Sequence, residues 1–312
     1  MATQDAVRHG VRALGAEPEL GRQRGLWTDA WRRLIRNRLA ITAIVVLALV
    51  VLVAFVGAYV GPLARYAPND QNYDAIQSGP STQHWFGTDQ LGRDLFARVL
   101  EGLRISLQIG IGAAAVVLIL GVSVGAAAAM GGKWSDNLLM RFADIMISLP
   151  EILAIILLRS VLVGHDWPIV TNKKMIIILA IGGVAWITVA RLVRGQMLSL
   201  AERDFVLAAR ALGASRWRIV YTHMLPNTLG PVIVAITFAI PGAIFAEAAL
   251  GFLGLGLPPP AASLGTLVSS GYTVIQRNVW NVVFPASAIA ALMLCFTFLG
   301  DGLRDALDPR SR

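Results

Sequence analysis

Apolar residues gather into long runs along this chain, separated by short polar or charged segments. Most of the runs reach the length of about 20 residues that an α-helix needs to cross the hydrocarbon layer of a membrane. Glycine, proline or charged residues bound each run, as is typical of the ends of membrane helices. The spans that we predict from these runs are Leu39 to Val60, Ile105 to Met130, Phe142 to Val163, Met175 to Ala190, Thr228 to Leu257 and Val282 to Gly300.

The composition favours lipid as the solvent. Hydrophobic residues make up 56% of the chain, charged residues only 15%, and the mean hydropathy is +0.64, which is more than a water-soluble domain of this length needs for its core. The one cysteine, Cys295, lies inside an apolar run, so we expect no disulfide framework within the chain. The sequence therefore predicts an all-α integral membrane protein with about six transmembrane helices.

The net charge of +8 reflects basic residues at the ends of the apolar runs rather than one basic patch, so nucleic acid is not an expected partner. Nineteen Lys and Arg residues flank the runs on one side and seven on the other. Because basic residues are retained on the cytoplasmic side, we expect both termini there. We expect three parts: a cytoplasmic tail with an interfacial helix (1–38), a transmembrane domain (39–302) and a second cytoplasmic tail (303–312). The transmembrane domain includes an extracytoplasmic segment (61–104) and a cytoplasmic loop (191–227).

The cytoplasmic loop at 191–227 has the composition of a folded element. Alanines around position 208 favour a helix, Gly213 is placed to end it, and a second basic helical turn follows from Ser215 to Tyr221. Small residues would let another protein approach closely, and arginines at 210, 216 and 218 offer charge to acidic groups. From the residues alone, a docking element and an amphipathic helix held by anionic lipid remain open alternatives.

The stretch LAARALGASRWRIVYTHMLPN resembles the cytoplasmic loop of ABC importer permeases, in which Glu-Ala-Ala is followed by a glycine and later by Leu-Pro. In that family the loop is the coupling helix, which fits a groove on the ATP-hydrolysing subunit. Leu207 stands where the family usually has glutamate, which puts a salt link at that position in doubt. The resemblance implies that the residues docking the ATPase are Leu207, Ala208, Ala209, Arg210, Gly213, Ala214, Arg216, His223 and Pro226.

A second stretch, HWFGTDQLGRDLFARVLEGLRISLQIG, resembles the segment before the second span of dipeptide and oligopeptide permeases. The alternatives for this motif are a structural turn at the outer membrane surface and a contact to the substrate or its binding protein. In the structural reading, Asp89, Arg93 and Asp94 form an ion-paired turn that sets the direction of the span. The matching residues are Gly87, Thr88, Asp89, Gly92, Arg93 and Asp94.

The segment EAALGFLGLGLPPP and the C-terminal LGDGLRDALDPR are similar to the C-type permease subunit of peptide importers. The glycines at 251, 254 and 256 are expected to form a face where another helix packs closely. Charged groups inside spans are candidates for function, and here they are Glu247, Glu151 and Asp144. For Asp144, an ion pair with Arg141 three residues earlier is the simpler expectation.

The resemblance implies a transmembrane permease subunit of an ATP-driven ABC importer in a bacterial cytoplasmic membrane. Expected partners are a homologous second permease, two ABC ATPases, an extracytoplasmic substrate-binding protein, membrane lipid and a peptide substrate, with glutathione or nickel chelates as alternative cargoes. The chain has no G-x-x-x-x-G-K-[ST] motif, so we expect no enzyme activity here and expect ATP and Mg to bind the ATPase subunits. The histidines are scattered, so no cofactor or metal is expected in this chain.

Two other classes of membrane protein fit the sequence less well. A secondary transporter driven by an ion gradient would show an internal repeat or broken spans with paired ionisable groups at the midplane, and no clear repeat is present. A membrane-embedded enzyme would need His, Asp or Ser clustered at depth, and the charged residues inside the predicted spans are too dispersed for that.

Overall fold

The computed structural model describes residues 26–57, 60, 63, 65–164 and 172–308. The predicted N-terminal tail before residue 26 and the last four residues of the predicted C-terminal tail lie outside these ranges. All regular elements in the described ranges are helical, and an isolated bridge joins Thr88 to Asp94. The helices are α2 (Leu26–Leu34), α3 (Arg38–Val56), η2 (Tyr73–Ala75), α4 (Leu95–Met130), α5 (Gly132–Ser148), α6 (Glu151–Val163), α7 (Lys173–Ala201), α8 (Asp204–Ala211), α9 (Arg216–Ile219), η3 (Val220–Met224), α10 (Leu225–Phe252), α11 (Leu264–Tyr272) and α12 (Trp280–Leu307).

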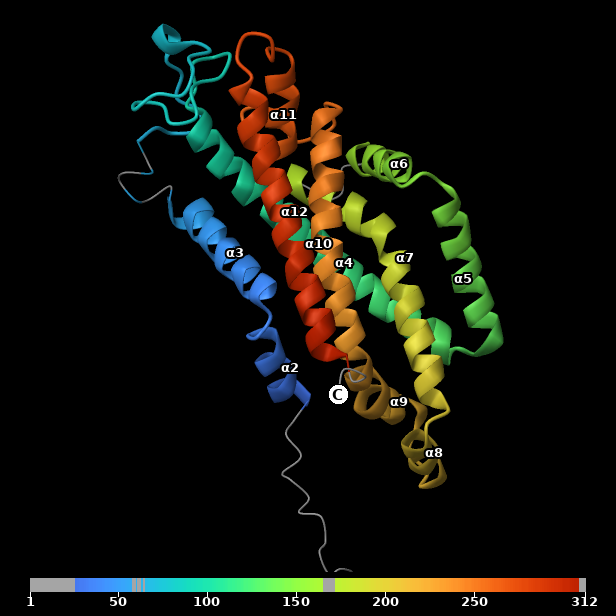
Figure 1. The fold of residues 1–312 in the computed structure, drawn as a ribbon. Helices are drawn as coiled ribbons and strands as arrows, with labels where there is room; N and C mark the ends of the chain where they lie inside the picture. Colours follow the sequence, from blue (N-terminus) through green and yellow to red (C-terminus); the bar gives the residue numbers. More distant parts are fainter. Residues whose placement is uncertain (1–25, 58–59, 61–62, 64, 165–171, 309–312) are drawn as a thin grey trace, which may run out of the picture.

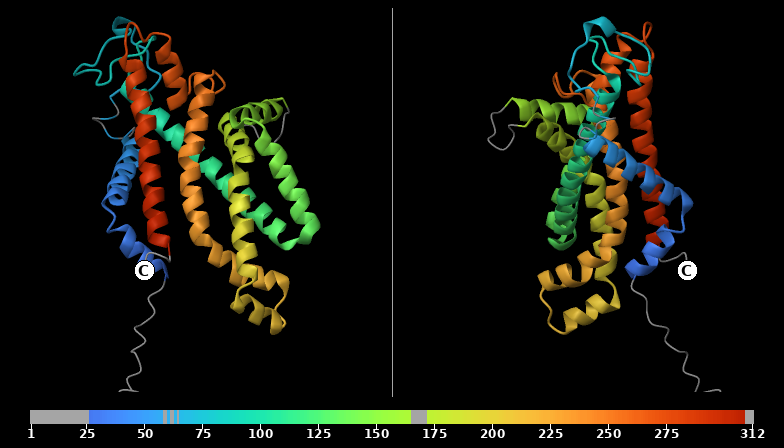
Figure 2. Two further views of the ribbon diagram at one scale, coloured as in Figure 1. Left: turned by 45° about the vertical axis from the view of Figure 1, so that its right-hand side comes forward. Right: turned by 90° about the vertical axis from the view of Figure 1, so that its left-hand side faces the viewer.

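In the described part of the chain, five helical segments are long and apolar enough to cross a membrane: α3, α4, α7, the continuous stretch from α9 through α10, and α12. Helices α3, α5 and α10 run in one direction and α4, α7 and α12 in the other (Figure 1). One end of the bundle carries α2, α8, α9 and the end of α12, and we call it the cytoplasmic end from the count of basic residues. The opposite end, which carries residues 65–94, α6 and α11, is the outer end (Figures 1 and 2).

The predicted span from Phe142 to Val163 is wrong as a single straight helix. Helix α5 begins earlier, at Gly132, and α6 is bent from it by 103°. The break lies at Leu149 and Pro150, where Leu149 has an extended backbone with ψ of 138°. A proline disfavours the helical conformation of the residue before it and cannot donate a backbone hydrogen bond. As a result α5 runs along the bundle and α6 turns across its outer end (Figure 2).

Three of the helices are longer than the predicted apolar runs, and one of them, α12, continues past Gly300 to Leu307. Helix α4 begins at Leu95 instead of Ile105, because the side chain of Asp94 accepts a hydrogen bond from the amide of Ala97 at 2.8 Å and caps the helix there. Helix α7 continues past Ala190 to Ala201, so the segment 191–227 starts inside a helix. Charged and polar residues interrupt the apolar pattern in these extensions, so the apolar runs alone do not predict them.

Helix α4 runs obliquely across the bundle and packs most extensively against α7. Glycines bring the two backbones together. A Cβ atom at Gly182 would lie 2.6 Å from Cβ of Val116, and one at Gly121 would lie 2.7 Å from Cβ of Val189. Lipid tails are as apolar as these side chains, so close van der Waals contact, rather than transfer out of water, holds membrane helices together.

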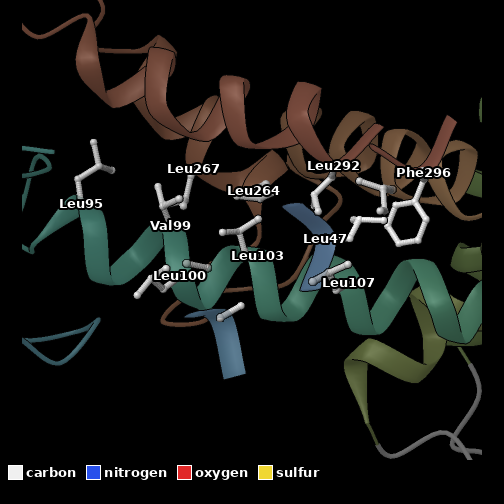
Figure 3. Close-up of a cluster of buried hydrophobic side chains, with 13 residues drawn as sticks. Leu47, Leu95, Val99, Leu100, Leu103, Leu107, Leu264, Leu267, Leu292 and Phe296 are labelled. Atoms are coloured by element: carbon white, nitrogen blue, oxygen red, sulfur yellow. The ribbon is translucent and has the colours of Figure 1, made fainter. Parts of the chain in front are cut away.

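A cluster of buried side chains joins α4 to α3, α11 and α12 near the outer end (Figure 3). Residues of α4 at intervals of four form one stripe of this cluster, as expected for a helix with about 3.6 residues per turn. The close-up shows the stripe facing α11 and α12. The cluster includes Leu47, Leu95, Val99, Leu103, Leu107, Leu264, Leu267, Leu292 and Phe296.

The α4–α7 contact predicts different outcomes for two glycines of α7. Replacing Gly182 by alanine places its Cβ against Val116 and the carbonyl oxygen of Ala113, and overpacking of this kind costs about 1–3 kcal/mol. Gly195 has open space around an added Cβ, and alanine there gains about 1 kcal/mol of helix propensity. Thermal unfolding in detergent should therefore show a lower midpoint for Gly182→Ala and an unchanged or higher one for Gly195→Ala. Equal shifts in the two variants would contradict the packing role of Gly182.

Candidate functional site

The two short helices at the cytoplasmic end have the geometry predicted for residues 204–219. Helix α8 ends in a Schellman motif, in which the amide of Ala214 donates to the carbonyl of Ala209 and the amide of Gly213 to that of Arg210, both at 3.0 Å. Gly213 has a φ of 82°, a left-handed conformation that favours glycine. Ser215 then caps α9 through the amide of Arg218. The predicted pair of helices joined at Gly213 is confirmed.

Buried side chains attach α8 and α9 to the transmembrane helices. Val206 of α8 and Ile219 of α9 are buried in a cluster with Val193 and Met197 of α7 and Val232 of α10. The backbone between α9 and α10 is continuous, and a π-helical turn, η3, lies at their junction. A force on α8 or α9 is therefore transmitted directly to α7 and α10.

The outward face of these helices carries exposed apolar side chains. The exposed fractions are 89% for Leu212 and 68% for Trp217, and the ring of Trp217 stacks on Tyr221 at 6.0 Å. Exposed apolar groups rimmed by charge mark interaction surfaces. The predicted docking residues do not include Leu212, Trp217 and Tyr221, although apolar residues in a basic loop were a usable signal.

The nine predicted docking residues do not all share this exposed face. Leu207 is about half exposed, so the position where related loops carry glutamate faces outward with an apolar side chain. Exposed are Leu207, Ala208, Arg210, Gly213, Arg216 and Pro226, whereas Ala209, Ala214 and His223 are half-buried.

Ion pairs join α5 to α7 near the cytoplasmic end. The predicted pair of Asp144 with Arg141 is wrong, because Asp144 accepts from Nη2 of Arg191 at 2.7 Å. Asp136 receives two hydrogen bonds from Arg194, through Nε and through Nη2. Such bidentate pairs fix geometry as well as charge. The charges on Asp144 and Asp136 thus position α5, which otherwise buries little of its surface.

A cavity of about 720 Å³ lies between the α5–α6 break, α7 and α10. Its lining is mainly apolar and includes Leu149, Pro150, Thr188, Phe238 and Gly242. We call it the inner cavity. Glu151 lines it and is exposed, and it is the one charged residue among the described residues of the lining. Because Glu151 begins α6, the positive end of the helix dipole favours its carboxylate.

Glu247 lies elsewhere, fully buried between α10, α4 and the start of α11. The hydroxyl of Ser106 donates to Oε2 of Glu247 at 2.8 Å, and the amide of Leu264 donates to the same hydroxyl at 3.3 Å. Glu247 is not among the described residues that line the inner cavity. Its contacts join three helices.

The extracytoplasmic motif forms a compact turn before α4. Asp89 pairs with Arg93 at 2.7 Å and lies 3.4 Å from Nε of Arg98, which confirms part of the predicted ion-paired turn. Asp94 instead caps α4 and hydrogen-bonds Nδ1 of His84 at 2.9 Å. Gln90 donates to Ser270 and Thr273 and so ties the motif to α11.

Glycines permit the backbone path of this motif. Gly87 and Gly92 have φ of 80° and 71°, and a Cβ at Gly92 would lie 1.8 Å from the carbonyl oxygen of Asn72. Thr88 is buried and donates to the carbonyl of Ala75. The expected packing role of the later glycines is confirmed for two of the three. Gly251 lies against the backbone of α11 and Gly256 against Gly251 and Thr266, whereas a Cβ at Gly254 would meet open space.

Comparison with known proteins agrees with this geometry. Residues 118–312 match the family described as binding-protein-dependent transport system inner membrane component, and residues 25–80 match the N-terminal TM domain of oligopeptide transport permease C. The oligopeptide transport system permease protein OppC of Bacillus subtilis is 41% identical over 92% of this chain and 90% of its own length. The dipeptide transport system permease protein DppC of the same organism is also 41% identical, over 91% of this chain and 86% of its own length.

Solved structures with a similar fold have more distant sequences. An inward-facing structure of the MetNI methionine ABC transporter aligns with a TM-score of 0.55 and 20% identity, covering 68% of this chain and 96% of that chain. An amino acid ABC transporter aligns with a TM-score of 0.52 and 16% identity, over 66% and 92% of the two chains. These likenesses support the type I ABC importer permease fold. The chain therefore belongs to the family of binding-protein-dependent transport system inner membrane components, the membrane permease subunits of ABC importers.

Proposed function

We propose that this chain is the C-type permease half of an ATP-driven peptide importer. The observation that carries the proposal is the anchored pair α8 and α9, which presents Leu212 and Trp217 at the cytoplasmic end. The names of the oligopeptide and dipeptide permeases to which it is similar support peptides as the cargo.

The proposed partners follow from the missing ATP-binding motif and from the exposed surface of α8 and α9. Its sequence has no phosphate-binding G-x-x-x-x-G-K-[ST] motif, so two separate ATPases would bind ATP and Mg and dock on α8 and α9. A second, homologous permease completes the pathway, and an extracytoplasmic binding protein delivers the peptide to the outer end.

The coupling step is mechanical. Closure of the ATPases moves α8 and α9, and the buried contacts of Val206 and Ile219 pass this movement to α7 and α10. Both helices line the inner cavity. The bundle then alternates between two packings whose populations are biased by nucleotide and by cargo.

The docking proposal predicts different effects for two exposed tryptophans at the cytoplasmic end. Trp217→Ala removes an aromatic anchor from α9 and should lower peptide-stimulated ATP hydrolysis of the reconstituted importer by at least about tenfold, as truncation of an interface hot spot does. Trp31→Ala is the matched control, because Trp31 is similarly exposed (62%) and lies on α2. Both variants should insert and pair with the second permease. A comparable loss of ATP hydrolysis in Trp31→Ala would argue against specific docking at α9.

The pathway proposal predicts different effects for two glycines of α10. Gly242 lines the inner cavity, Gly230 does not, and an added Cβ meets open space at both positions. The indole of Gly242→Trp should project into the cavity, narrow it and lower uptake of radiolabelled peptide into vesicles several-fold, with basal ATP hydrolysis retained. Gly230→Trp should leave uptake near the wild-type rate. Normal uptake in Gly242→Trp would exclude the inner cavity from the pathway.

A further inference from the structure

A second cavity, of about 710 Å³, lies at the outer end of the bundle. We call it the outer cavity. It is bounded by the end of α6, the start of α7, the connection after α10, and α11. Four cationic side chains line it, and none of the described lining residues is acidic; the four are Arg93, Arg98, Arg159 and Lys173. The lining therefore favours an anionic occupant.

Two of these cations already have a shared counter-ion. Arg93 and Arg98 both contact the carboxylate of Asp89, and Arg98 also donates to the carbonyl of Pro68 and to Asn69. Glu101, on the turn of α4 after Arg98, lines a different cavity. Asp89 thus balances one of these two positive charges, and Glu101 also interacts electrostatically with Arg98.

The other two cations have no ion-pair partner among the residues that the structure describes. Nε of Arg159 is buried without a hydrogen-bond partner, which is unfavourable for a guanidinium unless an acceptor occupies the site. Lys173 lines the outer cavity, whereas its neighbour Lys174 donates from Nζ to Gln108 of α4 at 3.0 Å and is absent from the lining. Because Arg159 lines the outer cavity, an anion there would meet its uncompensated positive charge.

The rest of the lining suits a small amphipathic molecule. Thr266 and Ser269 offer hydroxyl groups, and Ile176, Ile177 and Leu257 offer apolar surface. A buried cluster that includes Ile177 and Leu257 also separates the outer cavity from the inner one.

Helix α6 presents opposite charges to the two cavities, with Arg159 in the outer and Glu151 in the inner. Arg159 therefore attracts the carboxylate of a peptide in the outer cavity, and Glu151 attracts its ammonium group only after the peptide has reached the inner cavity.

We propose that the outer cavity binds the carboxylate of the peptide cargo, through Arg159 and Lys173, before the cargo moves inward. This inference rests on the proposed function. An arginine fork matches the two oxygens of a carboxylate, and the lysine adds a mobile point charge. The site would receive the peptide as it leaves the binding protein and orient it towards the inner cavity.

Charge-selective thiol labelling of the complete importer in vesicles tests the proposal. Val163 lines the outer cavity, is 54% exposed, and can be changed to cysteine in a chain whose Cys295 is replaced by alanine. An anionic methanethiosulfonate reagent should label Val163→Cys at least about tenfold faster than a cationic reagent of similar size, because the cavity concentrates anions. A dipeptide should slow this labelling, and the same dipeptide with an amidated C-terminus should not.

Three charge variants show which side chains cause the anion selectivity and the protection by the dipeptide. Arg159→Gln and Lys173→Gln should each lower the labelling ratio several-fold and weaken the protection by the dipeptide. Lys174→Gln removes the same charge from the next residue and should leave both readouts unchanged. If Arg159→Gln does not assemble, Lys173→Gln with its Lys174→Gln control still decides the proposal.

Several results would overturn the carboxylate assignment. Equal labelling by both reagents, or equal protection by the dipeptide and its amide, would exclude carboxylate recognition. Selectivity that is present in phosphatidylcholine vesicles and lost when phosphatidylglycerol is added would assign the cavity to a lipid headgroup. Protection by peptide-free binding protein would assign it to a carboxylate of that protein. Peptide-stimulated ATP hydrolysis, measured in parallel, separates these outcomes from a failure of the proposed function.

Discussion

The close contact of α4 with α7 and α10 is the constraint on which the other features of this bundle depend. Inside a membrane, helices cannot gain stability by leaving water, so they must approach closely or share polar contacts. Glycines on α4 and α7 allow that approach, and Gly110 of α4 does the same against Ile244 of α10. The hydrogen bond between Ser106 and Glu247 joins α4 to α10 nearby and fixes their register. The positions of both cavities follow from how these three helices are held.

The break at Pro150 gives the bundle its two cavities. A straight third span would have filled the space beside α7 and α10, whereas α6 instead turns across the outer end. The inner cavity opens at the break, and the outer cavity lies beside the far end of α6. A short helix anchored on α7 by apolar contacts can move without unfolding the bundle, which suits a protein that must alternate between two packings.

The cytoplasmic end is built differently. Helices α8 and α9 are held rigidly, and their outward face carries exposed apolar side chains. The Schellman motif and the serine cap define α8 and α9 locally, and buried valine and isoleucine side chains bind them to α7 and α10. The bidentate pair of Asp136 with Arg194 attaches α5 to the same stretch of α7. Under the proposed function, movement of α8 and α9 would therefore reach three helices at once.

The sequence was sufficient for the features that depend on local chemistry. Run length and composition gave the membrane class and five of the spans, and the alanines, Gly213 and Ser215 gave the two cytoplasmic helices. The partners of charged residues could not be read in this way, because Asp144 meets Arg191 on another helix rather than Arg141 on its own. The outer cavity was equally hidden, since its four cations come from separate segments that meet only after α4, α6 and α7 pack. Helical propensity and span length act over a few turns of one chain segment. Cavities and ion pairs depend instead on distances between segments. The glycine contacts and the bend at Pro150 set these distances.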